Sequence, residues 1–356
     1  MIKVHILSPG FTTPNGRAFL FPVKVWHSAL RRRDISVALF NRQTKNLIDC
    51  DVLMVDSKFH RDRWLFETRE ILEEFGNFTR HCRVIYCDTT DSSGWLQTEL
   101  LPIVHLYAKA QLLRDLSAYR LPMYAYRPFT DYYHRKYGVI DAKPEWSQAV
   151  ANPALLSKLR VSWNSGLADY SRLGPARMAL YDKVAFGGLL RFPRRFTESR
   201  SPRLRDLSGR FGASYPRASV SYQRQMIQRR LADRLDTAKV SRRRYFDELE
   251  TSKAVLSPFG FGEITLKDFE VFLTGGLLIK PDMSHLETWP DLFHANRTML
   301  AHKWDLSDFD AVIENATCSY DSTIEVAQAG QDEYRRHLVG EEAEILFCNQ
   351  FKSLLH

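Results

Sequence analysis

The segment Tyr245–Pro290 has the sequence YFDELETSKAVLSPFGFGEITLKDFEVFLTGGLLIKPDMSHLETWP. Its apolar runs and turn residues predict that a helix ends at Ser252–Lys253 and that a short strand follows. A glycine-rich turn, a second short helix and a second strand come next. We therefore expect a β-loop-α-β unit, with its parts at Ala254–Leu256, Gly260–Gly262, Thr265–Gly275 and Leu277–Ile279.

The turn and the short helix after it have the features of an anion site. Glycines such as Gly260 and Gly262 let a backbone bend sharply and approach a ligand closely. Thr265 and Asp268 form an imperfect capping box, and Gly275-Gly276 is expected to end the helix in the left-handed conformation. The free N–H groups at the start of such a helix attract phosphate.

Three charged residues of this unit are donor-site candidates. Glu263 lies in the loop and Glu270 in the helix, and carboxylates accept hydrogen bonds from the vicinal hydroxyls of a ribose or a hexose. Lys280, at the end of the second strand, is expected to neutralise a diphosphate. The alternative is an ordinary corner with solvated carboxylates; Lys280 and the preceding strand favour the binding site.

The amino-acid composition limits the classes of protein to which this chain can belong. With 356 residues, 44% of them hydrophobic, the chain suits two globular domains. The net charge of +8 suggests an anionic partner, although arginine clusters such as Arg31–Arg33, Arg229–Arg230 and Arg242–Arg244 are also compatible with solvated helix faces. Five scattered cysteines without a Cys-x-x-Cys pair argue against zinc and fit a reducing cytoplasm. Because no signal peptide or membrane span is evident, we expect a cytoplasmic protein with at most peripheral membrane contact.

Strands alternate with helices in the first part of the chain, which predicts a parallel sheet. The expected strands are Lys3–Leu7, Ile35–Phe40, Val52–Asp56 and Arg83–Cys87, and the expected helices are Pro22–Arg33 and Arg61–Phe75. After a polar linker at Ile140–Pro153, a strand at Leu159–Trp163 is expected to open a second domain. Later elements are a loop-rich basic stretch, Phe192–Arg217, and helices at Ser221–Leu235, Ser241–Glu250 and from Ser307 onward.

The expected architecture is α/β, with two tandem Rossmann-like domains that face a cleft. Their predicted ranges are 1–145 and 154–335, followed by a C-terminal helix, 336–356, that packs back on the first domain. Ligands of parallel sheets bind at the carboxyl ends of the strands. The site is therefore expected in the cleft between the domains.

The first domain offers acceptor-site and catalytic candidates. The loop Thr12–Arg17 is expected to form one wall of the cleft, with Gly16 and Arg17 as acceptor-binding candidates and a plain turn as the alternative. The loop Asp88–Gly94 is dense in carboxylates and hydroxyls. Either Asp91 or Asp88 could act as the general base that an inverting transferase needs, and Asx-turn capping is the alternative role.

The second domain offers further binding candidates. Ser165, in the turn Asn164–Gly166, could offer an N–H group to a phosphate. Arg224, with Arg217 and Tyr222, could hold a base and a diphosphate. His285 and Glu287 are expected to line the cleft, and no third ligand nearby completes a metal site.

Two parts of the central segment resemble known sugar-transferring enzymes. The pattern Tyr245…Leu249…Ser252-Lys253…Leu256-Ser257-Pro258…Gly260 is similar to the donor-binding segment of exostosin-like glycosyltransferases. The run DFEVFLTGGLLIKP resembles the corresponding part of GT-B glycosyltransferases. The resemblance implies that Glu270 binds the ribose of a sugar nucleotide, that the first domain binds the acceptor and that the second binds the donor. The retaining branch of that superfamily has a glutamate before its Gly-Phe-Gly turn; here Phe259 takes that position, and Glu263 follows the turn.

The resulting hypothesis is a glycosyltransferase that needs no metal cofactor. It would move a sugar from an activated, nucleotide-linked donor to a cell-surface glycan or a lipid-linked acceptor, and positive charge could dock it on an anionic membrane. Alternatives are a sugar-nucleotide epimerase or hydrolase on the same fold, or a basic nucleic-acid-binding protein. No nucleic-acid recognition signature supports the last alternative. A dinucleotide dehydrogenase is weaker still, since no Gly-x-Gly-x-x-Gly follows a strand.

Overall fold

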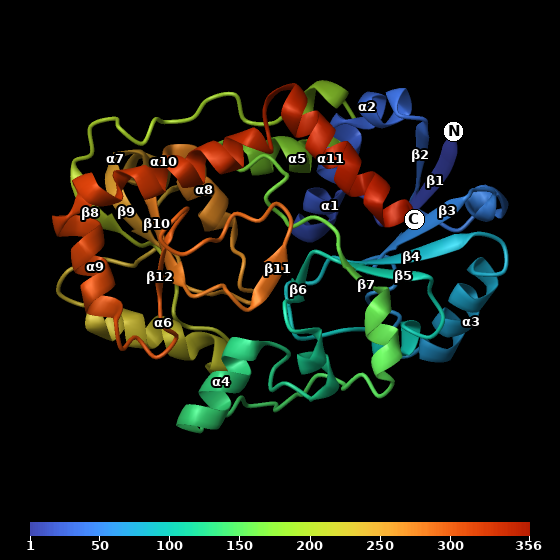
Figure 1. The fold of residues 1–356 in the computed structure, drawn as a ribbon, viewed down its shortest axis with the longest axis horizontal. Helices are drawn as coiled ribbons and strands as arrows, with labels where there is room; N and C mark the ends of the chain where they lie inside the picture. The colour runs from blue at the N-terminus through green and yellow to red at the C-terminus, as the bar shows by residue number, and fades with distance from the viewer.

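Two parallel β-sheets with flanking helices form the computed structural model, which describes residues 1–356 (Figure 1). The first sheet has six strands in the order β2-β1-β3-β4-β5-β7, and the second has four in the order β12-β10-β9-β8. A two-stranded antiparallel ribbon, β11-β6, lies between the sheets. This arrangement confirms the predicted α/β class with parallel sheets.

The strands and helices have the following bounds. The first sheet contains β1 Ile2–Leu7, β2 Ile35–Phe40, β3 Val52–Asp56, β4 Arg83–Asp88, β5 Leu106–Lys109 and β7 Leu159–Val161. The second contains β8 Arg205–Ser208, β9 Ser252–Leu256, β10 Leu277–Pro281 and β12 Leu300–His302, and the ribbon pairs β6 Gln111–Leu113 with β11 Leu286–Thr288. The α-helices are α1 Pro14–Val25, α2 His27–Arg32, α3 Thr68–Phe78, α4 Pro128–Tyr137, α5 Gly174–Val184, α6 Ala218–Arg230, α7 Arg242–Thr251, α8 Leu266–Thr274, α9 Phe309–Cys318, α10 Tyr320–Arg336 and α11 Gly340–Leu355. Short 3₁₀ segments occur at Lys45–Ile48, Thr98–Leu100, Leu116–Arg120, Pro153–Lys158 and Gly187–Leu189.

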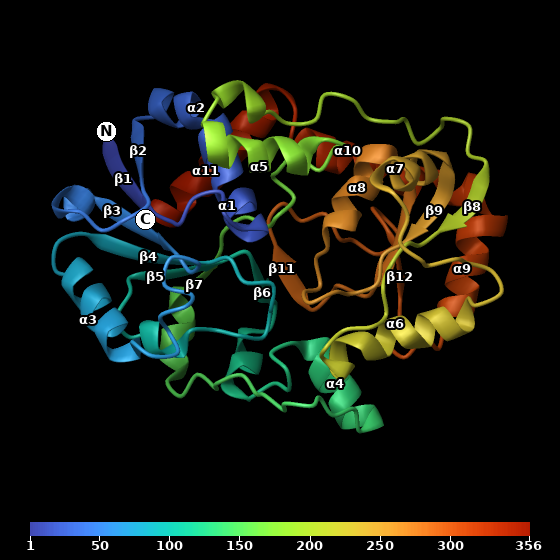
Figure 2. The same ribbon diagram turned by 180° about the vertical axis from the view of Figure 1, so that it is seen from behind.

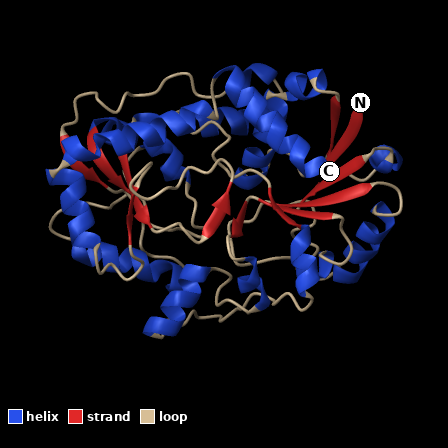
Figure 3. Cartoon of the chain, viewed as in Figure 1, coloured by secondary structure: helices blue, strands red, loops and turns tan.

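Helices cover both sheets, which explains why the central strands are buried along their whole length (Figure 3). Every residue of β3 and of β10 is buried. Parallel strands with both faces covered require such continuous burial. A core cluster of 69 buried residues draws side chains from both sheets, so the two halves share apolar packing.

The β-loop-α-β unit predicted from the central segment is present as β9, α8 and β10. Thr265 is the N-cap of α8, and its N–H donates to Asp268 Oδ2 at 2.8 Å, so the capping box is complete. Gly275 ends the helix with a φ of +68°, as glycine allows. Strands β9 and β10 then pair side by side in parallel. These features are local in sequence, and they follow the prediction closely.

Two helix starts in the first half differ from the prediction. The first helix begins at Pro14, where Thr13 is the N-cap and its Oγ1 accepts the Gly16 N–H at 3.1 Å. Pro22, expected to start that helix, lies inside it instead. The next helix, α3, begins at Thr68 and not at Arg61. Proline is tolerated in the first helical turn, and the earlier proline, preceded by a threonine cap, marks the true start.

The strand predicted at Leu159–Trp163 is present as β7, Leu159–Val161, but it belongs to the first sheet. It was expected to open the second domain, but β7 pairs with β5 at the edge of the first sheet. The first strand of the second sheet is β8, in the basic stretch expected to be loop-rich. A strand of three residues carries too little pattern to specify its distant partner. The predicted domain ranges themselves stay a prediction.

Segments also cross between the two halves. Helix α11 returns to the first half, where Glu344 Oε1 pairs with Arg33 Nη1 at 2.9 Å and Gln350 Nε2 donates to Val161 O at 2.9 Å. On the opposite side of the molecule, α4 lies against α6 (Figure 2). None of the helices combines the length and the apolar character that crossing a bilayer requires.

Candidate active site between the two sheets

An open cleft of about 1230 Å³ lies where loops from the two halves meet. One side is formed by the start of α1 and by the loops that follow β3 and β4. The opposite side is formed by the loop between β9 and α8, residues 260–266, and by side chains that flank it. The cleft therefore lies at the carboxyl ends of parallel strands, where such folds bind their ligands.

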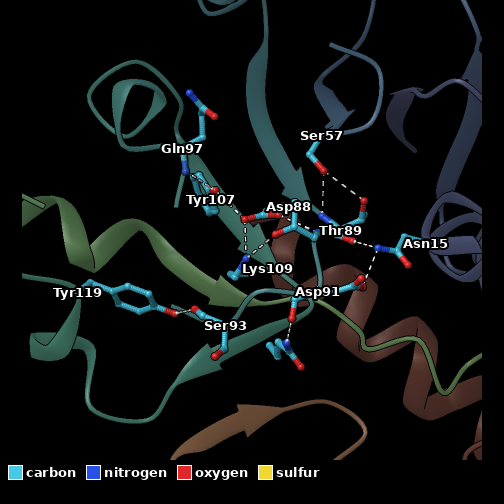
Figure 4. A network of polar contacts seen from close by, with 12 residues as sticks. Asn15, Ser57, Asp88, Thr89, Asp91, Ser93, Gln97, Tyr107, Lys109 and Tyr119 are labelled. Atoms are coloured by element: carbon cyan, nitrogen blue, oxygen red, sulfur yellow. Dashed lines mark hydrogen bonds and ion pairs between the residues drawn. The ribbon is translucent and has the colours of Figure 1, made fainter. Parts of the chain in front are cut away.

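Asp91 is an accessible carboxylate of this cleft. Its Oδ1 accepts a hydrogen bond from Asn15 Nδ2 at 2.9 Å, and the same amide donates to Thr89 O at 2.8 Å (Figure 4). Its backbone oxygen accepts from Gln111 Nε2 at 2.6 Å. The second carboxylate oxygen makes no hydrogen bond within the protein. Asp91 is thus held in place with one oxygen available to a ligand, as the role of a general base requires.

Asp88 has a different environment from the one expected of a catalytic base. It is fully buried at the end of β4, where its Oδ2 accepts from Lys109 Nζ at 2.6 Å and from the Tyr107 hydroxyl at 2.8 Å (Figure 4). Burial opposes its ionisation, but the charge and hydrogen bond of Lys109 prevail and lower its pKa. The prediction that Asp88 is a candidate base is corrected, because its carboxylate is paired and out of contact with the cleft.

The acceptor-site candidates in the first loop are also placed differently. The Gly16 N–H is used within the helix cap, and a Cβ at this position would lie 2.9 Å from Gly10 O. The Arg17 Nε donates to Phe11 O at 2.6 Å, so this arginine ties down its own loop. Neither residue lines the cleft, whereas Thr13, Pro14 and Asn15 of the same loop do, so the loop forms part of the wall as predicted. Asn15, which orients Asp91, was not singled out from the sequence because only its spatial neighbour reveals its role.

The Gly-Phe-Gly turn brings the two halves into contact. A Cβ on Gly262 would lie 2.6 Å from Asp91 O, closer than a side chain can approach. Gly260, whose N–H donates to Gly262 O at 2.9 Å, would place a Cβ 3.4 Å from Arg224 Nη2. Both glycines line the cleft. Gly262 allows a close approach as predicted, but the group that approaches is the backbone of the Asp91 loop.

Arg224 supplies a positive charge to the cleft wall. Its Nε donates to Phe259 O at 2.5 Å and its Nη1 to Gly212 O at 2.9 Å, while its guanidinium lies 4.9 Å from the centre of the Tyr215 ring. The remaining nitrogen, Nη2, makes no hydrogen bond. Because Arg224 lies beside the start of α8, its charge and the helix N–H groups together favour an anion there.

Ser165 lines the cleft too, but it enters from the first half, in the loop after β7. Its backbone oxygen accepts from the Tyr170 hydroxyl at 2.6 Å. Ser165 therefore lies on the first-half wall of the cleft, contrary to the expectation that it belongs to the second domain.

Lys280 does not face the cleft. Its side chain is fully buried, and its Nζ pairs with Asp268 Oδ2 at 3.0 Å. Burial lowers the pKa of this lysine, and Asp268 opposes that shift. The expected contact with a diphosphate is corrected: the last residues of β10 are buried under the helices, so Lys280 instead anchors the N-terminal turn of α8.

Glu270 is nearly buried, and both of its carboxylate oxygens have protein partners. The Tyr245 hydroxyl donates to Oε2 at 2.8 Å, and Arg242 Nη1 lies 3.3 Å from Oε1. Burial raises the pKa of this carboxyl group. Glu270 is not among the residues that line the cleft. Its binding to a ribose stays a prediction, and a ribose would have to displace one of these partners.

Glu263 joins the two halves. It is fully buried, and it accepts hydrogen bonds from Ser93 Oγ and, at 3.2 Å, from Gln111 Nε2, both of the first half. His285 Nε2 lies 3.9 Å from Oε1. Burial opposes ionisation of this carboxyl group, but His285 and Ser93 prevail and lower its pKa. The expected contact with donor hydroxyls is corrected, because all nearby donors belong to the protein.

Replacing Glu263 with glutamine is expected to lower the free energy of unfolding by about 1–3 kcal/mol, since a buried hydrogen-bonding group would lose its best partners. Urea unfolding at pH 7 measures the change. Glu287→Gln, which changes an exposed glutamate, is the control and should change stability by less than about 0.5 kcal/mol. Equal effects of the two variants would contradict the proposed joining role of Glu263.

The remaining candidates lie outside the cleft. Arg217 pairs with Glu145, Tyr222 packs against Tyr133, and Glu287 is exposed. His285 is half-buried, directly precedes β11, and has its ring 5.0 Å from that of Trp304. The structure contains no cluster of three or more His, Cys, Asp or Glu side chains suited to a metal ion. Independence from metal stays a prediction.

Comparisons with known proteins give fold-level likenesses only. No protein-family model matches the sequence, and no curated protein matches it. Among solved structures, Anabaena HepE in complex with UDP-glucose is similar over 100% of this chain and 99% of its own, with 10% identity and a TM-score of 0.46. An alpha-glucosyltransferase in complex with UDP matches over 100% of both chains, with 10% identity and a TM-score of 0.46. A glycosyltransferase from Rickettsia africae ESF-5 matches over 99% of this chain and 98% of its own, with 7% identity and a TM-score of 0.46. Likenesses this distant do not identify an activity.

Proposed function

We propose that this protein is a glycosyltransferase that takes a sugar from a nucleotide-linked donor and attaches it to a hydroxyl group of an acceptor. The observation that carries the proposal is the position of Asp91. This carboxylate is accessible, oriented by Asn15, and located in the same cleft as Arg224 and the start of α8. A base and an anion site within one cleft are the two elements that sugar transfer from a phosphate requires.

In the proposed reaction, Asp91 accepts the proton of the acceptor hydroxyl. The oxygen of that hydroxyl attacks the anomeric carbon of the donor sugar, and the bond from this carbon to the phosphate oxygen breaks. The bonding electrons leave with the nucleoside diphosphate. Arg224 and the N–H groups at the start of α8 stabilise the negative charge that develops on the departing phosphate. A single displacement of this kind inverts the anomeric configuration.

The side chains at the rim of the cleft favour an amphiphilic acceptor. We therefore propose further that the acceptor is a lipid-linked glycan. Leu65 is 81% exposed and Phe66 is 86% exposed, and both lie at the cleft together with Lys58 and Arg61. Apolar side chains beside cations suit an anionic lipid surface, where the chains insert and the cations contact the head groups. This arrangement would bring a membrane-borne acceptor to Asp91.

A nucleotide is expected to raise the melting temperature of the protein by binding in the cleft. A thermal-shift series with nucleoside mono- and diphosphates, run with and without EDTA, should identify one base that stabilises in both conditions. Arg224→Met should abolish the shift, whereas Arg229→Met, on the exposed face of α6, should retain it. The melting temperatures without ligand verify that both variants fold. The absence of stabilisation by every nucleotide and nucleotide sugar would overturn the proposal.

Product analysis separates transfer from the other reactions that this fold could support. With the stabilising donor and a lipid-linked acceptor, we expect a glycosylated acceptor and free nucleoside diphosphate. Release of free sugar at the same rate without acceptor would indicate a hydrolase. Conversion of the donor into a second nucleotide sugar would indicate an epimerase. Either outcome would replace the transferase assignment.

A further inference from the structure

A second cavity, of about 890 Å³, lies in the half that contains the second sheet, among α5, α7, α8 and α10. It contains none of the residues that line the cleft. Five arginines line it, and we call it the basic groove: Arg172, Arg177, Arg194, Arg195 and Arg335. Its only acidic lining residues are Glu198 and Glu250. The lining therefore carries three more positive than negative charges.

Several of these cations have binding capacity left. Arg194 and Arg195 are exposed and make no hydrogen bond or ion pair within the protein. Arg177 pairs with Asp169, but its Nε is buried without a partner. Arg172 pairs through Nη2 with Asp247 at 2.6 Å and with Glu250 at 3.5 Å, so its Nη1 and Nε stay without an acidic partner. Arg335 pairs through Nη2 with Glu198 at 2.9 Å and more loosely through Nη1 with Asp332 at 4.0 Å. An anion in the groove would supply the missing acceptors, because each guanidinium offers five N–H donors.

We propose that the basic groove binds a phosphodiester chain, that is, a flexible polymer with a phosphate at each unit. The planar guanidinium matches phosphate oxygens in a bidentate manner. One phosphate would occupy only a small part of the groove and leave most of its five arginines without contact to the ligand. Successive phosphates along a chain would contact Arg194, Arg195 and Arg172 together.

The aromatic residues of the groove indicate that it contacts the backbone of such a chain and not its bases. Phe196 is covered by the guanidinium of Arg335, 4.6 Å from the ring centre. Phe246 is covered by Arg242 at 4.8 Å and by Arg172 at 5.8 Å. Binding by base stacking requires open aromatic faces, which these rings lack. Phosphate contacts without base contacts give sequence-independent binding.

The groove is connected to the donor-site candidate Glu270 through Arg242. The Arg242 side chain donates from Nε to Arg172 O at 2.6 Å and from Nη2 to Ser171 O at 3.1 Å, and its Nη1 bonds Glu270. A polymer in the groove would thus lie one arginine away from Glu270. Binding in the groove is nevertheless a separate property, and it does not depend on the proposed transferase activity.

Titration of the full-length protein with fluorescent probes tests this inference. The probes are a single-stranded dT oligonucleotide and a glycerol-phosphate polymer. The binding affinity for each is measured from roughly 50 to 200 mM NaCl, because affinity that depends on phosphate contacts falls steeply over this range. The Arg194→Ala/Arg195→Ala double variant should bind at least about tenfold more weakly and have a salt slope smaller by about 2, roughly 1 per lost phosphate contact. Arg120→Ala/Arg229→Ala removes the same charge from exposed sites outside the groove and should bind as the unaltered protein does.

The two probes share one chemistry, so loss of binding in the groove variant with either polymer supports the proposal. The polymer that binds more tightly identifies the source of the phosphodiester chain. If both double variants weakened binding equally, net charge and not the groove would be responsible, and the proposal would fail. Absence of salt-dependent binding to both polymers would also overturn it. Nucleotide stabilisation of the groove variant should stay unchanged, which separates this test from that of the proposed function.

Discussion

Asp91→Asn should lower the rate of sugar transfer by about 10²- to 10⁴-fold, the usual contribution of a positioned general base. Asparagine keeps the shape of the side chain and can still hydrogen-bond Asn15, but it cannot take up a proton. Because the change lies in an exposed side chain, the nucleotide-dependent rise in melting temperature should be retained. The measurement is kcat with saturating donor and acceptor, combined with NMR of the anomeric proton, which should show inversion.

Asp62 offers a matched control for this prediction. It is an exposed carboxylate of the same cleft, on the loop after β3, and it makes no hydrogen bond within the protein. Asp62→Asn removes the same charge from the same cleft and should change kcat by less than about threefold, as expected for a residue outside proton transfer. If both variants lost activity equally, the effect would be due to the electrostatic potential of the cleft and not to a base at position 91. Retention of the anomeric configuration would likewise exclude Asp91 from the assigned role.

Local features were predictable from the sequence because their causes lie within a few residues. The strand, cap, helix and glycine of the β9-α8-β10 unit depend on neighbouring residues, and the structure reproduces them. The side-chain environments at the strand ends were not predictable. Asp88 is the last residue of β4 and Lys280 the last but one of β10, but each is buried and pairs with a residue of another element, Lys109 or Asp268 respectively.

Contacts between the two halves were the other part that sequence patterns missed. Glu263 was expected to meet a ligand, but it meets Ser93 and Gln111, which are 170 and 152 residues away along the chain. Strand β7 pairs with β5 in the first sheet, and its three-residue pattern does not indicate this partner. In both cases the partner is distant along the chain, in the other half of the molecule for Glu263 and within the first sheet for β7, and a single sequence does not show such pairings. The position of Asp91 in the cleft was predictable because the loop after β4 is polar and follows the carboxyl end of a parallel strand, whereas its role as a base stays a proposal.

Lys109→Met should lower the free energy of unfolding by about 3–5 kcal/mol, the typical cost of leaving one member of a buried ion pair uncompensated. Lys109 and Asp88 are both fully buried, with Nζ and Oδ2 2.6 Å apart. Methionine fills a similar volume but leaves the Asp88 carboxylate without its main counter-charge. Urea unfolding at pH 7 measures the loss, and far-UV circular dichroism verifies that the variant is folded in the absence of urea.

The Asp88→Asn/Lys109→Met double variant should recover more than half of that loss, since it removes both charges together. The pH dependence gives a second test. The Asp88 pKa is lowered in the folded protein, so its ionisation stabilises the fold above the unfolded-state pKa of about 3.9, and this stabilisation is lost as the pH falls through the folded-state value. The double variant should therefore lose less stability between pH 5 and pH 2, roughly the window in which such carboxylates take up protons. If the double variant were no more stable than Lys109→Met and showed the acid sensitivity of the unaltered protein, the ion pair would not be what stabilises this end of the first sheet.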